Sequence, residues 1–241
     1  MFTVFMESLR QGKKKHRNLM IAVVVILAVS LVGSFAIWQS PSGQGGSGSE
    51  SDNAAQYQAA LQSVQAAIDT KLTEVGEGNT PDFATASAIG ELYATAYQYN
   101  SMLEDAENAV IAANQAAIYY ELALQQAPAE LNEQGIANYK ALAGTYYLVS
   151  NQYEKAGRYL QEALEVMPAD YQLNYSYAMY LMRMNKTAEA IAHLTSYRAT
   201  LEEGSETAQQ VDSLIALLNA MQNPPEQSTD QAEDENAEAG E

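Results

Sequence analysis

The sequence contains no cysteine and only two histidines among its 241 residues. Without cysteine, the chain can form no disulfide and has no thiol nucleophile. The histidines, His16 and His193, stand in no spacing typical of a metal or catalytic site, and the sequence has neither a glycine-rich phosphate loop with a lysine nor a Gly-x-Ser-x-Gly motif. These absences predict that the protein is not an enzyme and holds no cofactor or metal.

Basic residues are scarce after the first 18 positions. Residues 1–18 carry five bases against one acid, Glu7, whereas residues 39–241 carry 29 acids against 7 bases. The net charges are +4 and −22, which add to −18 for the chain. Because the larger part would repel phosphates, nucleic-acid binding is not expected. Its field instead favours a protein or peptide partner that is basic.

The sequence has only one long apolar run, the uncharged segment Leu19–Trp38. As a helix, its 20 residues span about 30 Å, enough to cross the hydrocarbon core of a bilayer. The basic segment before it predicts a single-pass plasma-membrane protein whose N-terminus, residues 1–18, is cytoplasmic and whose remainder is extracytoplasmic. The alternative is a signal peptide cleaved near Ala36, which would yield a secreted protein.

Composition divides the rest of the chain into three parts. Residues 39–51 are rich in glycine and serine, which predicts a flexible linker. Residues 52–222 are rich in alanine, glutamine and tyrosine and lack β-branched runs, which favours an all-helical domain. Residues 223–241 hold seven acids, no base and no aromatic residue, which predicts a disordered tail.

An amphipathic helix is predicted at the start of this domain. Apolar residues recur there at alternating steps of four and three, at Tyr57, Leu61, Val64, Ile68, Leu72 and Val75. One interpretation is that this apolar seam packs onto the helices that follow. The other is a short parallel coiled coil through residues 57–75, which would pair two copies into a homodimer.

The segment Ala137–Pro168 has the spacing of two helices folded into a hairpin. Gly144 and Ala156 are twelve residues apart, and Ala163 follows seven residues later. Small side chains at a helix crossing let two backbones approach to roughly 8–10 Å. Asn151 lies at the break between the two periodic runs, and asparagine tolerates the left-handed conformation that such a turn needs.

Similar hairpins are predicted on both sides of this segment. The small residues that repeat its spacings are Ala94, Ala106 and Ala113 upstream, and Ala178 and Ala190 downstream. The upstream copy is longer, and its excess is interpreted as an extended second helix from about Met102 to Ala127. The three repeats then cover about 83–127, 137–168 and 171–202.

A further helix over residues 205–222 is predicted to close the domain. Its expected apolar face comprises Val211, Leu214, Ile215, Leu218 and Met221. Its polar side carries Glu206, Gln209, Gln210 and Asp212. A terminal helix with one apolar and one polar side is what a stack of repeats needs to cover its open end.

Counted from Ala137, the small residues fall at positions 8, 20 and 27 and a proline falls at position 32, a pattern that resembles the tetratricopeptide repeat (TPR). The resemblance covers about half of the chain. It implies an all-α, TPR-like α-solenoid of helix hairpins, preceded by the transmembrane helix and closed by the capping helix. It also implies that the small residues pack at helix crossings: Ala94, Ala106, Ala113, Gly144, Ala156, Ala163, Ala178 and Ala190.

In TPR arrays the first helix of each repeat lines a concave surface, so the resemblance also implies a peptide groove. The residues that it places there are Asn138, Ala141, Thr145, Leu148, Gln172, Tyr175, Met179, Met182 and Arg183. Tyrosine and methionine together make an adaptable surface for extended or helical peptides. The family's lysine and asparagine clamp for a C-terminal carboxylate is not matched by Ala141, Thr145 and Leu148.

These features predict a membrane-anchored, extracytoplasmic TPR scaffold that binds proteins or peptides. Its layout looks like that of bacterial membrane-anchored TPR proteins of envelope assembly, secretion or folding. One alternative is a structural membrane protein that associates with itself and has no peptide client. Another is an organelle-surface receptor for basic targeting peptides, inserted in the opposite orientation.

Overall fold

The computed structural model describes residues 50–222. The predicted transmembrane helix 19–38, nearly all of the linker 39–51 and the tail 223–241 lie outside these residues. Within the described range, no helix combines the length and the hydropathy that crossing a bilayer requires.

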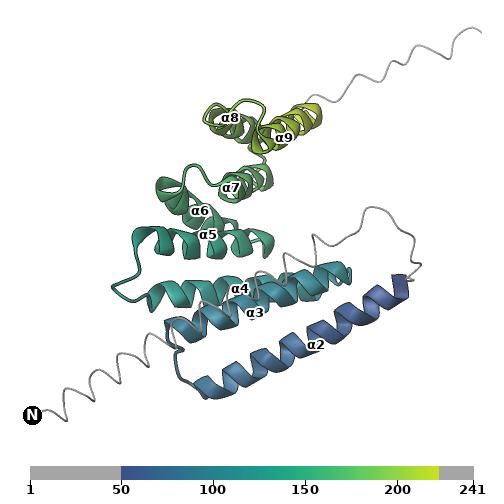
Figure 1. The fold of residues 1–241 in the computed structure, drawn as a ribbon, viewed down its shortest axis with the longest axis vertical. Coiled ribbons are helices and arrows are strands. Elements are labelled where there is room, and N and C mark those ends of the chain that lie inside the picture. Colours follow the sequence, from purple (N-terminus) through teal and green to yellow (C-terminus); the bar gives the residue numbers. More distant parts are fainter. Residues whose placement is uncertain (1–49, 223–241) are drawn as a thin grey trace, which may run out of the picture. The chain divides into compact units, whose positions relative to one another are not determined.

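Residues 50–222 form eight helices and no strand. The helices are α2 Glu50–Val75, α3 Phe83–Met102, α4 Ala106–Gln125, α5 Glu133–Val149, α6 Tyr153–Val166, α7 Tyr171–Arg183, α8 Thr187–Arg198 and α9 Glu206–Gln222. Each helix packs mainly against the helices next to it in the chain (Figure 1). This succession confirms the all-α class and is consistent with an α-solenoid.

Each of the three hairpins, α3–α4, α5–α6 and α7–α8, turns through one residue in the left-handed conformation. These residues are Glu104, Asn151 and Asn185, with φ of 58°, 62° and 59°. Asn151 was expected there, and Asn185 follows it by 34 residues. Glutamate at the first turn is unfavourable, because its Cβ crowds the backbone and its side chain lacks asparagine's short polar group.

The first helix of each hairpin begins at a capping side chain. Asp82, Asn132 and Asp170 accept hydrogen bonds from backbone N–H groups three residues later, at 2.8 Å in each case. Each such cap contributes about 1 kcal/mol by satisfying a donor that the helix leaves free. The caps therefore fix where α3, α5 and α7 start, and α5 starts at Glu133, four residues before Ala137.

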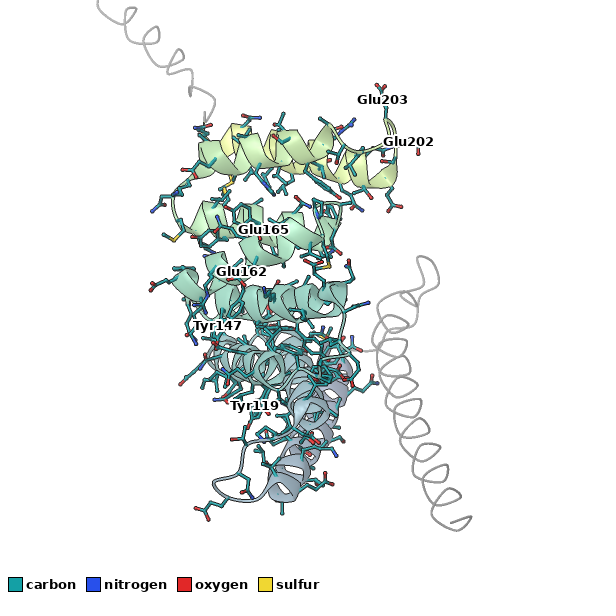
Figure 2. The ribbon with its side chains drawn as sticks, turned by 90° about the vertical axis from the view of Figure 1, so that its left-hand side faces the viewer. Tyr119, Tyr147, Glu162, Glu165, Glu202 and Glu203 are labelled. Carbon is teal, nitrogen blue, oxygen red and sulfur yellow. The ribbon has the colours of Figure 1, made fainter. Side chains whose placement is uncertain are left out.

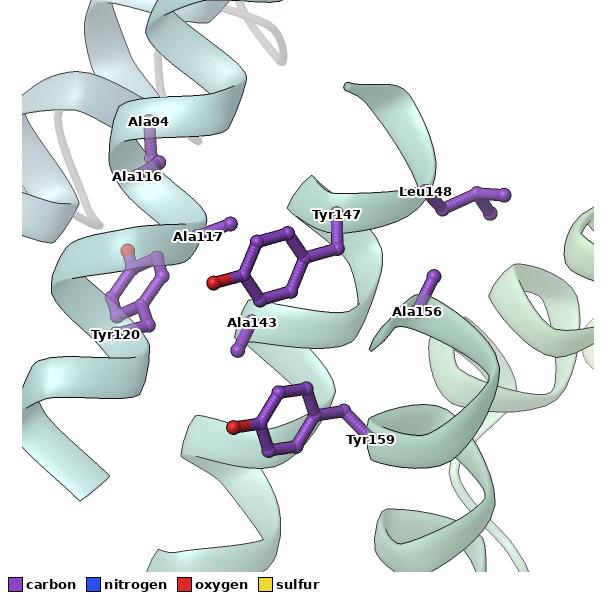
Figure 3. Close-up of a cluster of buried hydrophobic side chains, with 9 residues drawn as sticks. All are labelled: Ala94, Ala116, Ala117, Tyr120, Ala143, Tyr147, Leu148, Ala156 and Tyr159. Carbon is purple, nitrogen blue, oxygen red and sulfur yellow. The ribbon is translucent and has the colours of Figure 1, made fainter. Parts of the chain in front are cut away.

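Gly144 lies where α5 and α6 approach each other closely. A Cβ atom added to Gly144 would lie 2.9 Å from Leu160 Cγ and 3.1 Å from the Leu160 backbone nitrogen, so α5 and α6 leave no room for a side chain there. The predicted packing residues that are buried are Ala94, Ala113, Gly144, Ala156, Ala163, Ala178 and Ala190. Tyrosine rings occupy the space that the alanines leave, as Figure 3 shows for Tyr120, Tyr147 and Tyr159.

The prediction for Ala106 is wrong, because this residue is exposed at the first position of α4. Ala156 and Ala190 each lie five residues after a left-handed turn residue, and the buried residue five after Glu104 is Ala109. The spacing from Ala94 matched Ala106 by chance in an alanine-rich segment. The extended second helix is also corrected: α3 and α4 have 20 residues each, and α4 begins at Ala106 rather than near Met102.

The seam of α2 packs against α3. Ile68 is fully buried, and the rings of Tyr57 and Tyr99 lie 6.3 Å apart between their centroids. This packing agrees with the first of the two interpretations of the seam. At the other end of the domain, α9 covers α8 with Val211 and Leu218, and Arg198 pairs with Asp212 at 2.9 Å.

The predicted apolar face of α9 is wrong for Met221, which is 60% exposed. Its neighbour Leu217 is 57% exposed as well. Among the described helices only α8 packs substantially against α9, so one helix side is covered and residues turned away from α8 stay in solvent. The predicted polar residues Glu206, Gln209, Gln210 and Asp212 are exposed, as expected.

Candidate functional site

The candidate site is the solvent side of the first helices α3, α5 and α7, called here the first-helix surface. On α5, helical periodicity places Asn138, Leu142, Thr145 and Val149 on one face. Residues at matching distances before the left-handed turns occupy the equivalent face of the other two helices. Ser176 falls on this face but is buried, and the exposed Tyr175 stands beside it in the chain. The first-helix surface therefore comprises the exposed and half-buried residues of this face together with Tyr175, namely Glu91, Thr95, Gln98, Met102, Asn138, Leu142, Thr145, Val149, Gln172, Tyr175, Met179 and Arg183.

The nine predicted groove residues differ in exposure, and one of them, Leu148, is buried. Asn138, Gln172, Tyr175 and Arg183 are exposed, whereas Ala141, Thr145, Met179 and Met182 are half-buried.

Two of the half-buried residues, Thr145 and Met179, also contact a neighbouring hairpin. The Thr145 hydroxyl donates to Ser176 Oγ at 3.2 Å, which joins α5 to α7. Met179 packs against the cluster that contains Tyr147 and Ala156.

Leu148 does not belong to the surface. It is only 9% exposed and packs in the cluster with Ala143 and Ala156 (Figure 3). The family pattern assigned it to the groove, but its position three residues before the turn places it on the side of α5 that is covered by neighbouring helices. Leu148 is a core residue.

Two exposed apolar residues of this surface were missed. Leu142 is 38% exposed on α5, and Met102 is 46% exposed at the end of α3. Helical periodicity was the signal that could have found Leu142, because it lies four residues after Asn138 and three before Thr145. Met102 could be assigned to this surface only after the first turn was located at Glu104, because the sequence interpretation began the second helix near Met102.

The first helices are nearly free of charge. Across α3, α5 and α7 the only charged residues are Glu91, Glu133, Lys140 and Arg183, two acids and two bases. Lys140 is neutralised by Glu162 of α6 at 2.8 Å, and burial raises the pKa of Glu91. The net charge of −18 is thus carried by other segments, so the argument for a basic partner does not apply to this surface.

Two aromatic pairs connect α3 to α5. Tyr97 and Tyr146 meet edge to face at 5.8 Å between ring centroids, and Phe83 and Tyr139 meet likewise at 5.1 Å. Such pairs add about 0.5–1.5 kcal/mol beyond their burial. Burial, with Tyr97 nearby, raises the pKa of Tyr146 to about 12, so its hydroxyl stays protonated at neutral pH.

A polar network joins the first two hairpins. Glu121 of α4 accepts hydrogen bonds from Lys155 Nζ at 2.8 Å, from the Tyr159 hydroxyl at 2.9 Å and from the Tyr147 hydroxyl. Lys155 Nζ also lies 3.0 Å from the Tyr147 hydroxyl oxygen and 4.6 Å from the centre of that ring. The network ties α4, α5 and α6 together, and Figure 2 labels Tyr147 among the side chains of these helices.

The protonation states in this network are set by mutual hydrogen bonding. Burial alone would raise the pKa of Glu121, but the hydrogen bonds from Lys155, Tyr147 and Tyr159 outweigh it and lower that pKa. Burial and the bond to Glu121 raise the pKa of Tyr147 to about 12. Both carboxylate oxygens are already bonded, so the network is suited to connecting helices rather than to acid–base chemistry.

One cavity of about 300 Å³ lies at the end of α2. It is lined by Leu72 and Val75, by residues 76 and 79–81 of the following loop, and by Tyr119 and Leu122 of α4. None of the predicted site residues reaches it. No group of residues that could hold a metal ion occurs in the described part of the chain.

Two groups of acidic residues, Glu104, Asp105 and Glu107 before and within α4 and Glu202 and Glu203 after α8, are solvated or cap a helix. Asp105 accepts from the backbone and side chain of Asn108, and these hydrogen bonds lower its pKa. Glu202 and Glu203 are exposed in the loop between α8 and α9 (Figure 2). Neither cluster forms a site.

The chain matches no protein-family model, and no curated protein is similar to it at a significant level.

Proposed function

We propose that this chain is a membrane-anchored, extracytoplasmic scaffold that binds a protein or peptide on its first-helix surface. The observation that carries the proposal is the composition of that surface. In a chain of net charge −18, it combines the exposed apolar side chains of Met102, Leu142 and Tyr175 with amides such as Asn138 and Gln172.

The chemistry of the surface fits a polypeptide ligand. A side-chain amide offers both donors and an acceptor, which match the N–H and C=O groups of a peptide bond. Exposed apolar and aromatic side chains contribute roughly 25 cal/mol for each Å² that a ligand covers. Methionine adapts to irregular partners because its side chain is unbranched and polarizable.

The location is the second part of the proposal. It rests on the basic segment 1–18 and the apolar run 19–38, which favour an anchor with the domain outside the cytoplasm. The TPR resemblance of the hairpins supports a role in assembling envelope, secretion or folding complexes, where a client is held close to the membrane.

Site-specific photo-crosslinking of the full-length chain in its native membrane tests the binding surface. A photoreactive residue replaces Leu142 or Tyr175, and the matched control replaces Ile111 of α4, which is apolar and 52% exposed but lies on a second helix. We expect positions 142 and 175 to capture the same protein and position 111 not to capture it. Capture of that protein equally from all three positions would contradict the proposal.

A further inference from the structure

His193 places an unpartnered nitrogen inside the last hairpin. Its ring, on α8, meets the ring of Tyr177 of α7 edge to face, with centroids 4.9 Å apart and planes at 72°. The Nε2 atom is buried and has no hydrogen-bond partner among residues 50–222. Buried polar atoms are nearly always paired, so this atom is an exception that calls for an explanation.

The groups around His193 supply no counter-charge. On α7 its neighbours are Tyr177 and Asn174, and Gln161 of α6 donates to the Tyr177 hydroxyl at 2.8 Å. The charged residues of the packed elements are engaged or in solvent: Glu189 of α8 pairs with Lys186, and Asp212 of α9 pairs with Arg198.

On α6, Glu162 pairs with Lys140 and Glu165 is exposed. No carboxylate of the described residues forms an ion pair with the imidazole.

Protonation of this ring would disturb the hairpin. An imidazolium carries N–H groups on both nitrogens, so Nε2 would become a buried donor without an acceptor, and the charge would have no partner. Burial lowers the pKa of His193 below its ordinary value of 6.5, and the Asn174 backbone carbonyl offsets only part of that effect.

We propose that His193 is an acid-sensitive latch, so that uptake of one proton opens the α7–α8 hairpin while the first two hairpins stay closed. Opening would move the α7 part of the first-helix surface, which holds Gln172, Tyr175 and Arg183. That consequence for a ligand rests on the proposed function, whereas the opening itself does not.

The direction of the effect follows from linkage. When the hairpin opens, the exposed ring binds a proton with its ordinary pKa of 6.5, which is higher than the pKa in the closed hairpin. The closed state is therefore fully stabilised above pH 6.5 and loses stability as the pH falls from 6.5 towards the lower pKa. One proton changes the opening equilibrium by at most about tenfold per pH unit.

Amide hydrogen exchange of the full-length chain in detergent tests the latch without any ligand. Protection factors, corrected for the intrinsic exchange rate, are measured between pH 7.5 and 5.5. We expect protection over 171–198 to fall by up to about tenfold per pH unit, with residues 83–125 changing less. His193→Phe keeps an aromatic ring against Tyr177 but cannot titrate, so its protection should stay flat, whereas His16→Gln should behave like the unaltered chain.

Equal losses of protection in the His193→Phe variant and in the unaltered chain would overturn the latch. A second measurement does not depend on how the variants fold. Because the chain has only two histidines, NMR titration assigns both with the His16→Gln variant. A pKa of 6.5 or higher for His193 in the folded chain would also overturn the proposal. Neither result bears on whether the first-helix surface binds a client.

Discussion

Lys155 Nζ lies 2.8 Å from Oε2 of Glu121, and this contact joins α6 to α4 across the boundary between the first two hairpins. The two residues are 34 apart in the chain, and the same carboxylate also binds Tyr147 and Tyr159. Glu121 thus connects three helices through one side chain, which makes it the first target for substitution.

Glu121→Gln should destabilise the chain by about 1–3 kcal/mol, because it weakens three charge-assisted hydrogen bonds. The Lys155 side chain is 43% exposed, so solvent screens the ion pair and the larger share should come from the two tyrosine hydroxyls. Urea unfolding of the full-length chain measures the change. Tyr159→Phe, which removes one of the three bonds, should cost less than Glu121→Gln, and the reverse order would contradict this reading of the network.

The contribution of Glu121 should depend on pH. The network lowers its pKa from the ordinary value of 4.5, so the stabilisation is fully present above pH 4.5 and is lost as the pH falls through the lowered value. The difference in unfolding free energy between the unaltered chain and Glu121→Gln should stay constant from pH 7 to about 5 and shrink below 4.5. A difference that grows in acid would show that the carboxylate is not held ionised by its partners.

Gly144→Ala should destabilise the α5–α6 crossing by about 1–3 kcal/mol, because the new Cβ meets the Leu160 backbone as well as its side chain. Gly135→Ala is the matched control on the same helix. There a Cβ meets side-chain atoms only, Cδ1 and Cγ of Leu131 at 2.5 and 3.0 Å and Oδ1 of Asn132 at 3.2 Å, and alanine favours helix by about 1 kcal/mol over glycine. Thermal unfolding should therefore separate the two variants, and a lower midpoint for Gly135→Ala than for Gly144→Ala would refute the tight crossing.

Glu104→Gly should stabilise the chain by roughly 0.5–1 kcal/mol. Glu104 is held at φ 58°, where glycine pays no steric cost and glutamate does. Asn151→Gly should stabilise the chain less than Glu104→Gly, since asparagine already tolerates its φ of 62°. Chemical denaturation compares the two variants, and a loss of stability in Glu104→Gly would mean that the turn is held by something other than its backbone conformation.

The coiled-coil interpretation of the α2 seam gives a separate test. Because the chain has no cysteine, Leu61→Cys introduces a single thiol at the seam. Since the seam packs on α3, we expect no disulfide-linked dimer under mild oxidation in native membranes. Ala59→Cys, at an exposed position of the same helix, reports random collisions. A dimer formed at position 61 but not at position 59 would favour the paired coiled coil instead.

The sequence predicted features that depend on local pattern. Asn151 was identified as the left-handed turn residue because it interrupts two periodic runs, and Gly144 and Ala156 were identified as crossing residues because their spacing is that of a hairpin. The assignment of Ala106 failed because alanine is so frequent upstream that several registers fit, and only the turn at Glu104 selects one. The assignment of Leu148 to the peptide groove failed because the family pattern does not show how far neighbouring helices cover that position.

Other features depend on contacts between distant segments and leave no local signal. Nothing near Glu121 indicates Lys155 or Tyr159, since their contact needs α4 and α6 to be placed first. The exposure of Met221 likewise depends on which helices lie against α9. Periodicity alone placed Met221 on the same predicted apolar face as Val211. The unpartnered His193 Nε2 could not be foreseen, because burial of one ring atom depends on the exact approach of α7 to α8.

The most direct test of the central claim is a quantitative recovery of the protein that crosslinks at Leu142. Leu142→Asp places a charge on the first-helix surface, whereas Ile111→Asp places the same charge at an apolar, solvent-exposed position of α4. With the crosslinker at Tyr175, we predict at least a tenfold loss of that protein from Leu142→Asp and unchanged recovery from Ile111→Asp. Equal recovery from both variants would contradict binding on the first helices.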